Sequence, residues 1–311
     1  MKSPRLASLL TLSLGLLLQL SPLSAAAEPD TQGYPEKLVL LTQGPGPREE
    51  RLRVPIAVYE DADGRRVDLI GAIHLADGAY YRRLNLRFRN YDKLLYEMVN
   101  GETLSEMLWL RKLAKRGKAT EEQKARLQEL EKALAAEREN SLLSSLLNYY
   151  YNAMASRLGC TLQVEGIDYG QPNFVYADMS QEEFSAAMQE RGESWLSYFA
   201  EALAESFKNG SLMQGVALNN SSPVELRRSV MHLLVQSMEA STMGDKAIIV
   251  ARNERCMEVL DRELSHPEVR TVGIFYGAAH LRDMDERLRA RGFTLRSVEW
   301  MTAWKAGSKL K

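Results

Sequence analysis

The sequence lacks an excess of charge of either sign. Its 40 lysines and arginines nearly balance its 41 aspartates and glutamates, which leaves a net charge of −1 at pH 7. A chain without a basic surplus has no general electrostatic attraction to a polyanion, so we expect no nucleic-acid partner. The 311 residues are 45% hydrophobic and 26% charged, which is typical of a globular protein with a sizeable core.

Long hydrophobic runs are also missing, with one exception at the N-terminus. Two basic residues precede the apolar stretch 6–20, and small residues follow, with Ala25 and Ala27 at the positions of a signal-peptidase site. We therefore predict a signal peptide over 1–27 and a periplasmic or secreted mature chain without a stable membrane span. The alternative is a membrane anchor, for which the run is short, since a span needs ~20 residues.

Cysteine is scarce, because Cys160 and Cys256 are the only two in the chain. An oxidising compartment would permit a disulfide between them, and two buried thiols fit the sequence equally well. Neither has a sequence context typical of a catalytic thiol with a histidine partner. A cysteine protease is therefore not indicated.

Segments with a strand pattern alternate with segments with a helix pattern along the rest of the chain, which favours an α/β fold. We expect a mixed central sheet in a single domain over 51–304, with a helical insertion at about 102–158. An extended lead-in is predicted over 28–50, and 305–311 form a basic tail. No linker divides the predicted domain.

Local patterns place the individual elements. Alternation around an Ala-Asp-Gly turn predicts a hairpin of 54–60 with 66–73, followed by a helix over 77–90. A buried strand is expected at 92–99, and another short strand within 161–170. Capping boxes begin helices at Thr120 and Ser180. The other expected elements are helices at 193–207, 224–240, 245–264 and 281–292, a strand that ends before His280, and a last strand over 294–304.

Histidine is rare too, and two of the four histidines occupy matching contexts. His74 lies in the segment GAIHL and His280 in GAAHL, each directly after an apolar strand. α/β folds hold their ligands at such strand ends. Gly71 and Gly277 allow close approach of another backbone or a bound group, so we predict them at a cofactor. The alternative for either histidine alone is a structural hydrogen bond at a turn.

Each of these histidines belongs to the same order of elements: strand, histidine, helix, strand, glutamate. The glutamates are Glu97 in the first copy and, as a weaker candidate, Glu299 in the second. We interpret the order as two repeated β-α-β halves, which could pack face to face and bring His74 and His280 together. His232 on a helix and His266 before a proline are expected to be structural.

Two histidines and one carboxylate form a common set of ligands for a catalytic metal, with one position left open for water. His74, His280 and Glu97 are therefore our candidate ligands for a divalent metal. Glu97 could equally act as a general base, because both roles need a carboxylate in the same place.

Arg252 and Asn253 interrupt the apolar pattern of the helix expected over 245–264. A guanidinium group there could bind a substrate carboxylate or stabilise an oxyanion, so we include both residues as catalytic candidates. The alternative is an ion pair between Arg252 and a surface acid such as Glu254 or Asp261.

Together these residues resemble the TraB/PrgY/GumN family and its relatives, the TIKI metalloproteases. The resemblance covers roughly 50–304, and it is carried by the two Gly-x-x-His motifs, Glu97, and the Arg-Asn pair in ARNERCMEVL. The family implies a repeated α/β core similar to the erythromycin-esterase and ChaN-like folds. Ala72 departs from it, since many members have Thr or Ser there, and the block 102–158 matches poorly.

The TIKI relatives imply a metal-dependent protease that uses manganese or cobalt, while the ligand set also allows zinc. TraB and PrgY members imply inhibition of a secreted peptide pheromone. We therefore expect a metal-dependent hydrolase, a peptidase acting on a peptide or protein. The alternative is a protein on the same scaffold that binds a peptide or haem without chemistry.

Overall fold

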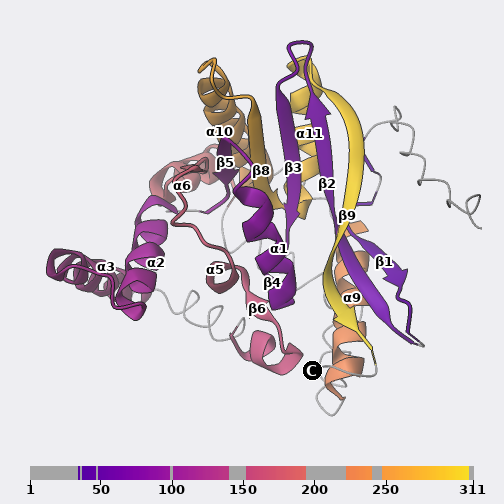
Figure 1. Cartoon of the computed structure of the whole chain (residues 1–311), viewed down its shortest axis with the longest axis horizontal. Coiled ribbons are helices and arrows are strands. Elements are labelled where there is room, and N and C mark those ends of the chain that lie inside the picture. Colours follow the sequence, from indigo (N-terminus) through magenta and orange to yellow (C-terminus); the bar gives the residue numbers. More distant parts are fainter. Residues whose placement is uncertain are drawn as a thin grey trace, which may run out of the picture.

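The computed structural model shows an α/β protein with a mixed central sheet (Figure 1). The signal peptide and the helix expected at 193–207 lie outside the described residues, except for residue 193. Within the part that is described, no helix is long and apolar enough to cross a membrane. The structure describes residues 34–98 except 36 and 47, and residues 101–139, 152–193, 222–239 and 247–307.

Seven strands form the main sheet in the order β1-β2-β3-β8-β5-β7, with β9 paired to the other edge of β2. Strands β3, β8, β5 and β7 run parallel to one another, while β1, β9 and β3 are antiparallel to β2. Strands β4 and β6 form a small separate sheet. The strands are β1 (Leu40–Gln43), β2 (Glu50–Glu60), β3 (Arg66–Ala72), β4 (Leu75–Ala76), β5 (Lys93–Tyr96), β6 (Thr161–Leu162), β7 (Phe174–Tyr176), β8 (Thr271–Gly277) and β9 (Thr294–Ala306).

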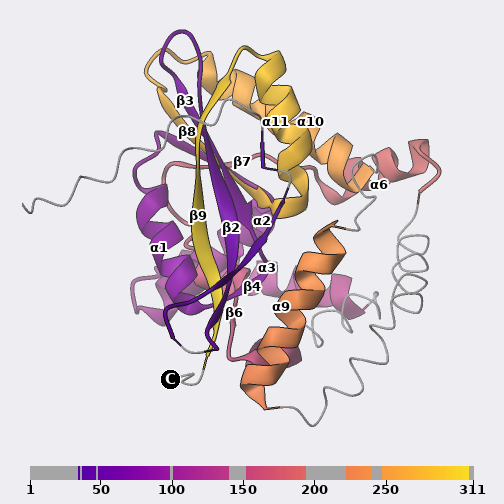
Figure 2. The same cartoon turned by 90° about the vertical axis from the view of Figure 1, so that its right-hand side faces the viewer.

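Helices cover both faces of the sheet, with α1 on one side and α10 and α11 on the other (Figure 2). Successive strand residues point to opposite faces. On β8, Phe275 accordingly packs in the core beneath α1, while Ile274 and Tyr276 pack in the core beneath α10 and α11. The helices are α1 (Gly78–Phe88), α2 (Gly101–Lys115), α3 (Glu121–Glu139), α5 (Gln163–Gly166), α6 (Gln181–Glu190), α9 (Pro223–Glu239), α10 (Ala247–Leu264), the 3₁₀ turn η3 (Ala278–His280) and α11 (Leu281–Ala290).

The face beneath α1 contains a buried carboxylate. Asp68 on β3 is fully buried, and the Tyr91 hydroxyl donates a hydrogen bond to it at 2.5 Å. Arg66 donates two hydrogen bonds to the same carboxylate, and Arg87 on α1 donates a third. The charge of Asp68 is therefore compensated, and the ion pairs fix α1 to the sheet.

The predicted hairpin is confirmed as β2 and β3, which pair from Glu60↔Arg66 to Ile56↔Ile70. The expected strand over 161–170 is largely wrong. Only β6 is extended there, and the chain turns directly into α5, whose Gly166 packs against the Tyr81 ring. Strand β7 was not expected, because three residues are too few to show an alternating pattern.

The sheet also extends beyond the domain limits that the sequence indicates. Strand β1 lies inside the predicted lead-in 28–50 and pairs with β2, and β9 continues into the predicted tail 305–311. The single-domain prediction itself stays a prediction.

The insertion begins with two helices, α2 and α3, that project from the sheet (Figure 1). Met107 and Leu110 of α2 pack against Leu127 and Leu130 of α3 in a small core of their own. The capping box at Thr120 is present, since Thr120 and Gln123 exchange hydrogen bonds between side chain and backbone. Residues 152–158 are also helical.

Candidate functional site

The candidate site lies where the parallel strands of the sheet end. His74 follows β3, His280 ends the 3₁₀ turn after β8, Glu97 follows β5, and Asp178 follows β7. Because neighbouring parallel strands end at the same edge of a sheet, the loops after them lie together. Helix α10 packs against β5 and η3 and brings Arg252 to the same place.

Glu97 is the centre of the polar cluster. Its Oε1 lies 2.8 Å from the Arg252 guanidinium and 3.7 Å from Nε2 of His280. Its Oε2 accepts a hydrogen bond of 2.6 Å from the backbone N–H of Gly277. Two donors, the Arg252 guanidinium and the Gly277 N–H, therefore face one carboxylate, and the His280 ring lies beside them.

This environment keeps Glu97 ionised. Burial alone would raise its pKa, but Arg252, then His280 and His74, and the Gly277 N–H favour the charged form and lower the pKa to about 2. The side chain is 12% exposed, so solvent screens these interactions little. A buried carboxylate that stays ionised at neutral pH is available to bind a cation.

His280 is buried, at 4% exposure, and its pKa is lowered to about 4. Burial causes the lowering, and the nearby charge of Glu97 opposes it only in part. The imidazole is therefore neutral at neutral pH. Its ring also makes an edge contact with Tyr276, with the ring centres 5.3 Å apart.

Asn253 determines which nitrogen of His280 carries the proton. Its amide nitrogen donates to Asp283 at 2.6 Å and to the His280 carbonyl at 3.1 Å, so its oxygen must face the ring. That oxygen lies 2.7 Å from Nδ1 of His280 and accepts from it. The proton is thus on Nδ1, and the lone pair of Nε2 points toward Glu97.

Arg252 is held by two carboxylates. Its Nε and one terminal nitrogen donate to the two oxygens of Asp178 at 2.9 and 2.6 Å, and the same terminal nitrogen reaches Glu97. Both acids raise the pKa of Arg252 against the effect of burial. The surface pairing with Glu254 or Asp261 is wrong, because these acids pair with other arginines.

The two glycines of the motifs differ in what surrounds them. A Cβ at Gly277 would lie 3.2 Å from Oε2 of Glu97, so this glycine permits the hydrogen bond to the carboxylate. A Cβ at Gly71 would meet Pro55 at 3.2 Å and Leu281 at 3.5 Å, so close protein packing alone accounts for this glycine. The proposed place of both glycines at a cofactor stays a prediction.

His74 differs from His280 in being exposed. Its backbone carbonyl accepts a hydrogen bond of 2.8 Å from the Gln163 N–H, which fixes the loop, and its electrostatic influence reaches Glu97. The other two histidines lie outside the cluster. His232 is exposed 3.5 Å from Glu50, and His266 is exposed in a turn.

Two of the three predicted ligands have the properties that a divalent metal requires. His280 offers a neutral imidazole with a free Nε2, and the oxygens of ionised Glu97 keep unused lone pairs. Within the described ranges, however, no three His, Cys, Asp or Glu side chains are grouped as they would be around a metal ion. The exposed His74 is the predicted third ligand, and the metal centre stays a prediction.

Sequence reasoning missed two acids of the cluster, Asp178 and Asp283. Asp178 follows the three-residue strand β7, which is too short to show a strand pattern in the sequence. A search for an acid that follows a strand and could pair with Arg252 would have included it. Asp283 lies in the first turn of α11, directly after His280, and it belongs to no motif that the sequence shows. The cysteines are both free thiols, and Cys256 is buried in the core beside α11.

No protein-family model, curated protein or solved structure matches the chain.

Proposed function

We propose that the chain is a periplasmic or secreted metal-dependent hydrolase, a peptidase, with its reaction at Glu97 and His280. One observation carries the proposal: an ionised, buried carboxylate lies 3.7 Å from the free nitrogen of a neutral imidazole, at the ends of parallel strands. Both groups have a lowered pKa, so at neutral pH the carboxylate is ionised and the imidazole is neutral, which are the protonation states that a metal ligand needs. The resemblance to the TraB/PrgY/GumN family supports the same conclusion.

The residues of the cluster have separate roles in this proposal. Glu97 accepts the proton of the attacking water, or it binds the metal, while Asn253 holds His280 in the tautomer that offers Nε2. Arg252 is already paired with two acids, which supports a role in fixing Glu97 and in orienting a substrate carbonyl. A divalent ion held by His280, Glu97 and His74 would lower the pKa of bound water and polarise the scissile carbonyl.

The alignment of two neighbouring strands supports the proposed pair of repeated halves. Strands β3 and β8 are parallel, and Ala72 lies opposite Gly277 in their register. The two histidines thus follow the carboxyl ends of two adjacent parallel strands. Glu299 has no place in the proposed site, because it lies on β9 and pairs with Arg87 at 2.7 Å.

Paired variants test the proposal. The mature protein is purified, its metal content is measured by elemental analysis, and cleavage of a peptide library is followed with and without manganese. Glu97→Gln and His280→Ala are expected to lose about a hundredfold or more in cleavage, as for removal of a general base. His266→Ala, which removes an exposed histidine outside the cluster, is the matched control.

Two outcomes would contradict the proposal. Unchanged cleavage and metal content in Glu97→Gln and His280→Ala would exclude this cluster as the catalytic centre. Absence of cleavage by the wild type, together with tight binding of a peptide or haem that a chelator does not affect, would replace catalysis by ligand binding.

A further inference from the structure

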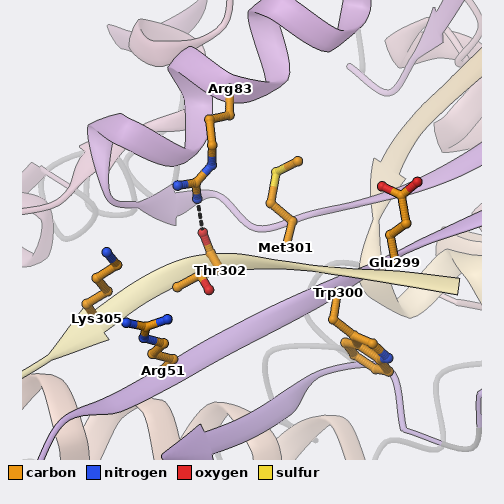
Figure 3. A pocket seen from close by; sticks show the side chains of 7 residues that line it. All are labelled: Arg51, Arg83, Glu299, Trp300, Met301, Thr302 and Lys305. Atoms are coloured by element: carbon orange, nitrogen blue, oxygen red, sulfur yellow. Dashed lines mark hydrogen bonds between the residues drawn. The ribbon is translucent and has the colours of Figure 1, made fainter. Parts of the chain in front are cut away.

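We propose that a second site, at the edge of the sheet formed by β9, binds a small oxyanion, either a carboxylate or a phosphate ester, attached to an apolar body. A surface cavity of about 290 Å³ lies between β9, β2 and α1 (Figure 3). In the sheet order, β2 and β3 separate β9 from β8, so this cavity is distinct from the His280 cluster. The proposal is independent of the hydrolase proposal.

Like charges face one another across the two strands of this cavity. Arg51 on β2 and Lys305 on β9 are direct partners in the antiparallel register, and both line the cavity. Two cations placed opposite each other repel and destabilise the pair of strands. Arg83 of α1 adds a third cation at the same end of the cavity (Figure 3).

Among the described residues, a carboxylate neutralises one of the three cations. Glu49 pairs with Arg51 at 2.7 Å, but among the described residues neither the Lys305 ammonium nor the Arg83 guanidinium has a carboxylate partner. Within the described ranges, Arg83 donates to a single acceptor, the carbonyl of Thr302, at 2.5 Å. A guanidinium has five N–H donors, so Arg83 retains donors for an oxyanion that would also relieve the repulsion.

The other end of the cavity has a different character. Trp300 and Met301 contribute apolar surface there, and Glu299 lies farthest from the cations (Figure 3). Glu299 itself is neutralised by Arg87. Trp300 and Met301 extend to opposite sides of β9, and Trp300 lies on the side of Arg51 (Figure 3). An anionic group at the basic end with an apolar body over Trp300 matches this distribution, and the volume is near the lower limit for small-molecule sites, about 300 Å³.

Benzoate and its neutral isostere benzamide test the site, with inorganic phosphate as a third probe. Binding to the mature protein is measured by calorimetry at low salt, because charges are screened beyond about 10 Å at 0.1 M. Benzoate is expected to bind with a dissociation constant of about 1 mM or below, consistent with its few atoms, and benzamide is not expected to bind. The indole N–H resonance of Trp300, assigned with Trp300→Phe, is expected to shift with benzoate.

Charge-removing variants locate the binding. Arg83→Gln and Lys305→Gln should each weaken benzoate binding about tenfold, as expected for loss of a charge-assisted hydrogen bond. Lys118→Gln, which removes an exposed cation on the α2–α3 turn, should leave it unchanged. Circular dichroism checks that each variant is folded.

The outcomes separate the alternatives. Binding of phosphate but not of benzoate, with the same sensitivity to Arg83→Gln, supports the oxyanion site and identifies phosphate as its source. Equal weakening by Lys118→Gln, or binding of benzamide as tight as benzoate, overturns the proposal. Failure of both anions to bind at low salt overturns it as well.

Discussion

Replacement of Glu97 by glutamine removes the charge at the centre of the polar cluster. The pKa of this carboxyl group is about 2, against an ordinary value of 4.5. The difference, 4.5 minus 2, corresponds to about 3 kcal/mol of unfolding free energy at neutral pH. We therefore expect Glu97→Gln to be less stable than the wild type by about 3 kcal/mol at pH 7.

The sign of the pH dependence follows from the lowered pKa. The unfolded chain binds the proton of Glu97 more tightly than the folded protein does, so the stabilisation is complete above pH 4.5 and is lost as the pH falls toward 2. The stability difference between wild type and Glu97→Gln should thus shrink to roughly 1 kcal/mol at pH 3.

Urea unfolding followed by circular dichroism at pH 7, 5 and 3 measures these differences. Glu299→Gln is the matched control, because Glu299 is 54% exposed and its surface ion pair should contribute less than about 1 kcal/mol at any of these pH values. A difference for Glu97→Gln that does not change with pH would refute the electrostatic explanation of the cluster.

Three further predictions concern neighbouring parts of the structure. Asn253→Ala removes the acceptor at Nδ1 of His280, so ¹⁵N NMR of the imidazole should change from one tautomer to a mixture; an unchanged spectrum would contradict the assignment of the proton. Asp68→Asn leaves Arg66 without a carboxylate and Arg87 with Glu299 alone, and it should reduce the unfolding free energy by about 3 kcal/mol in urea; a loss below about 1 kcal/mol would show that the arginines bind water instead. His74→Ala should change stability by no more than about 0.5 kcal/mol, as at other exposed positions, while the buried His280→Ala should cost about 2 kcal/mol; equal effects in thermal unfolding would contradict the difference in burial.

The sequence was sufficient to predict that Glu97 and His280 meet. Both follow short apolar strands, and strand ends in α/β folds gather at one edge. The two strands are in fact neighbours in the sheet, as β5 and β8. The contact between Arg252 and this pair depends instead on how α10 packs. A helical pattern does not reveal this packing, so the sequence also allowed an ion pair between Arg252 and a surface acid.

Other features could not be predicted because they depend on packing between distant segments. The two Gly-Ala-x-His segments look alike, yet His74 is exposed and His280 is buried, and α10 packs against the 3₁₀ turn that ends at His280. Asp178 gains its role from Arg252, 74 positions later in the chain. The repulsion between Arg51 and Lys305 arises from the register of β2 and β9, which composition does not encode.

The small sheet of β4 and β6 holds the loop of His74 in a different way from the turn of His280. Leu75 and Ala76, directly after His74, pair with the short strand that follows the helical insertion. The position of the His74 loop therefore depends on where the chain returns from the insertion, whereas His280 is held in the core through Asn253.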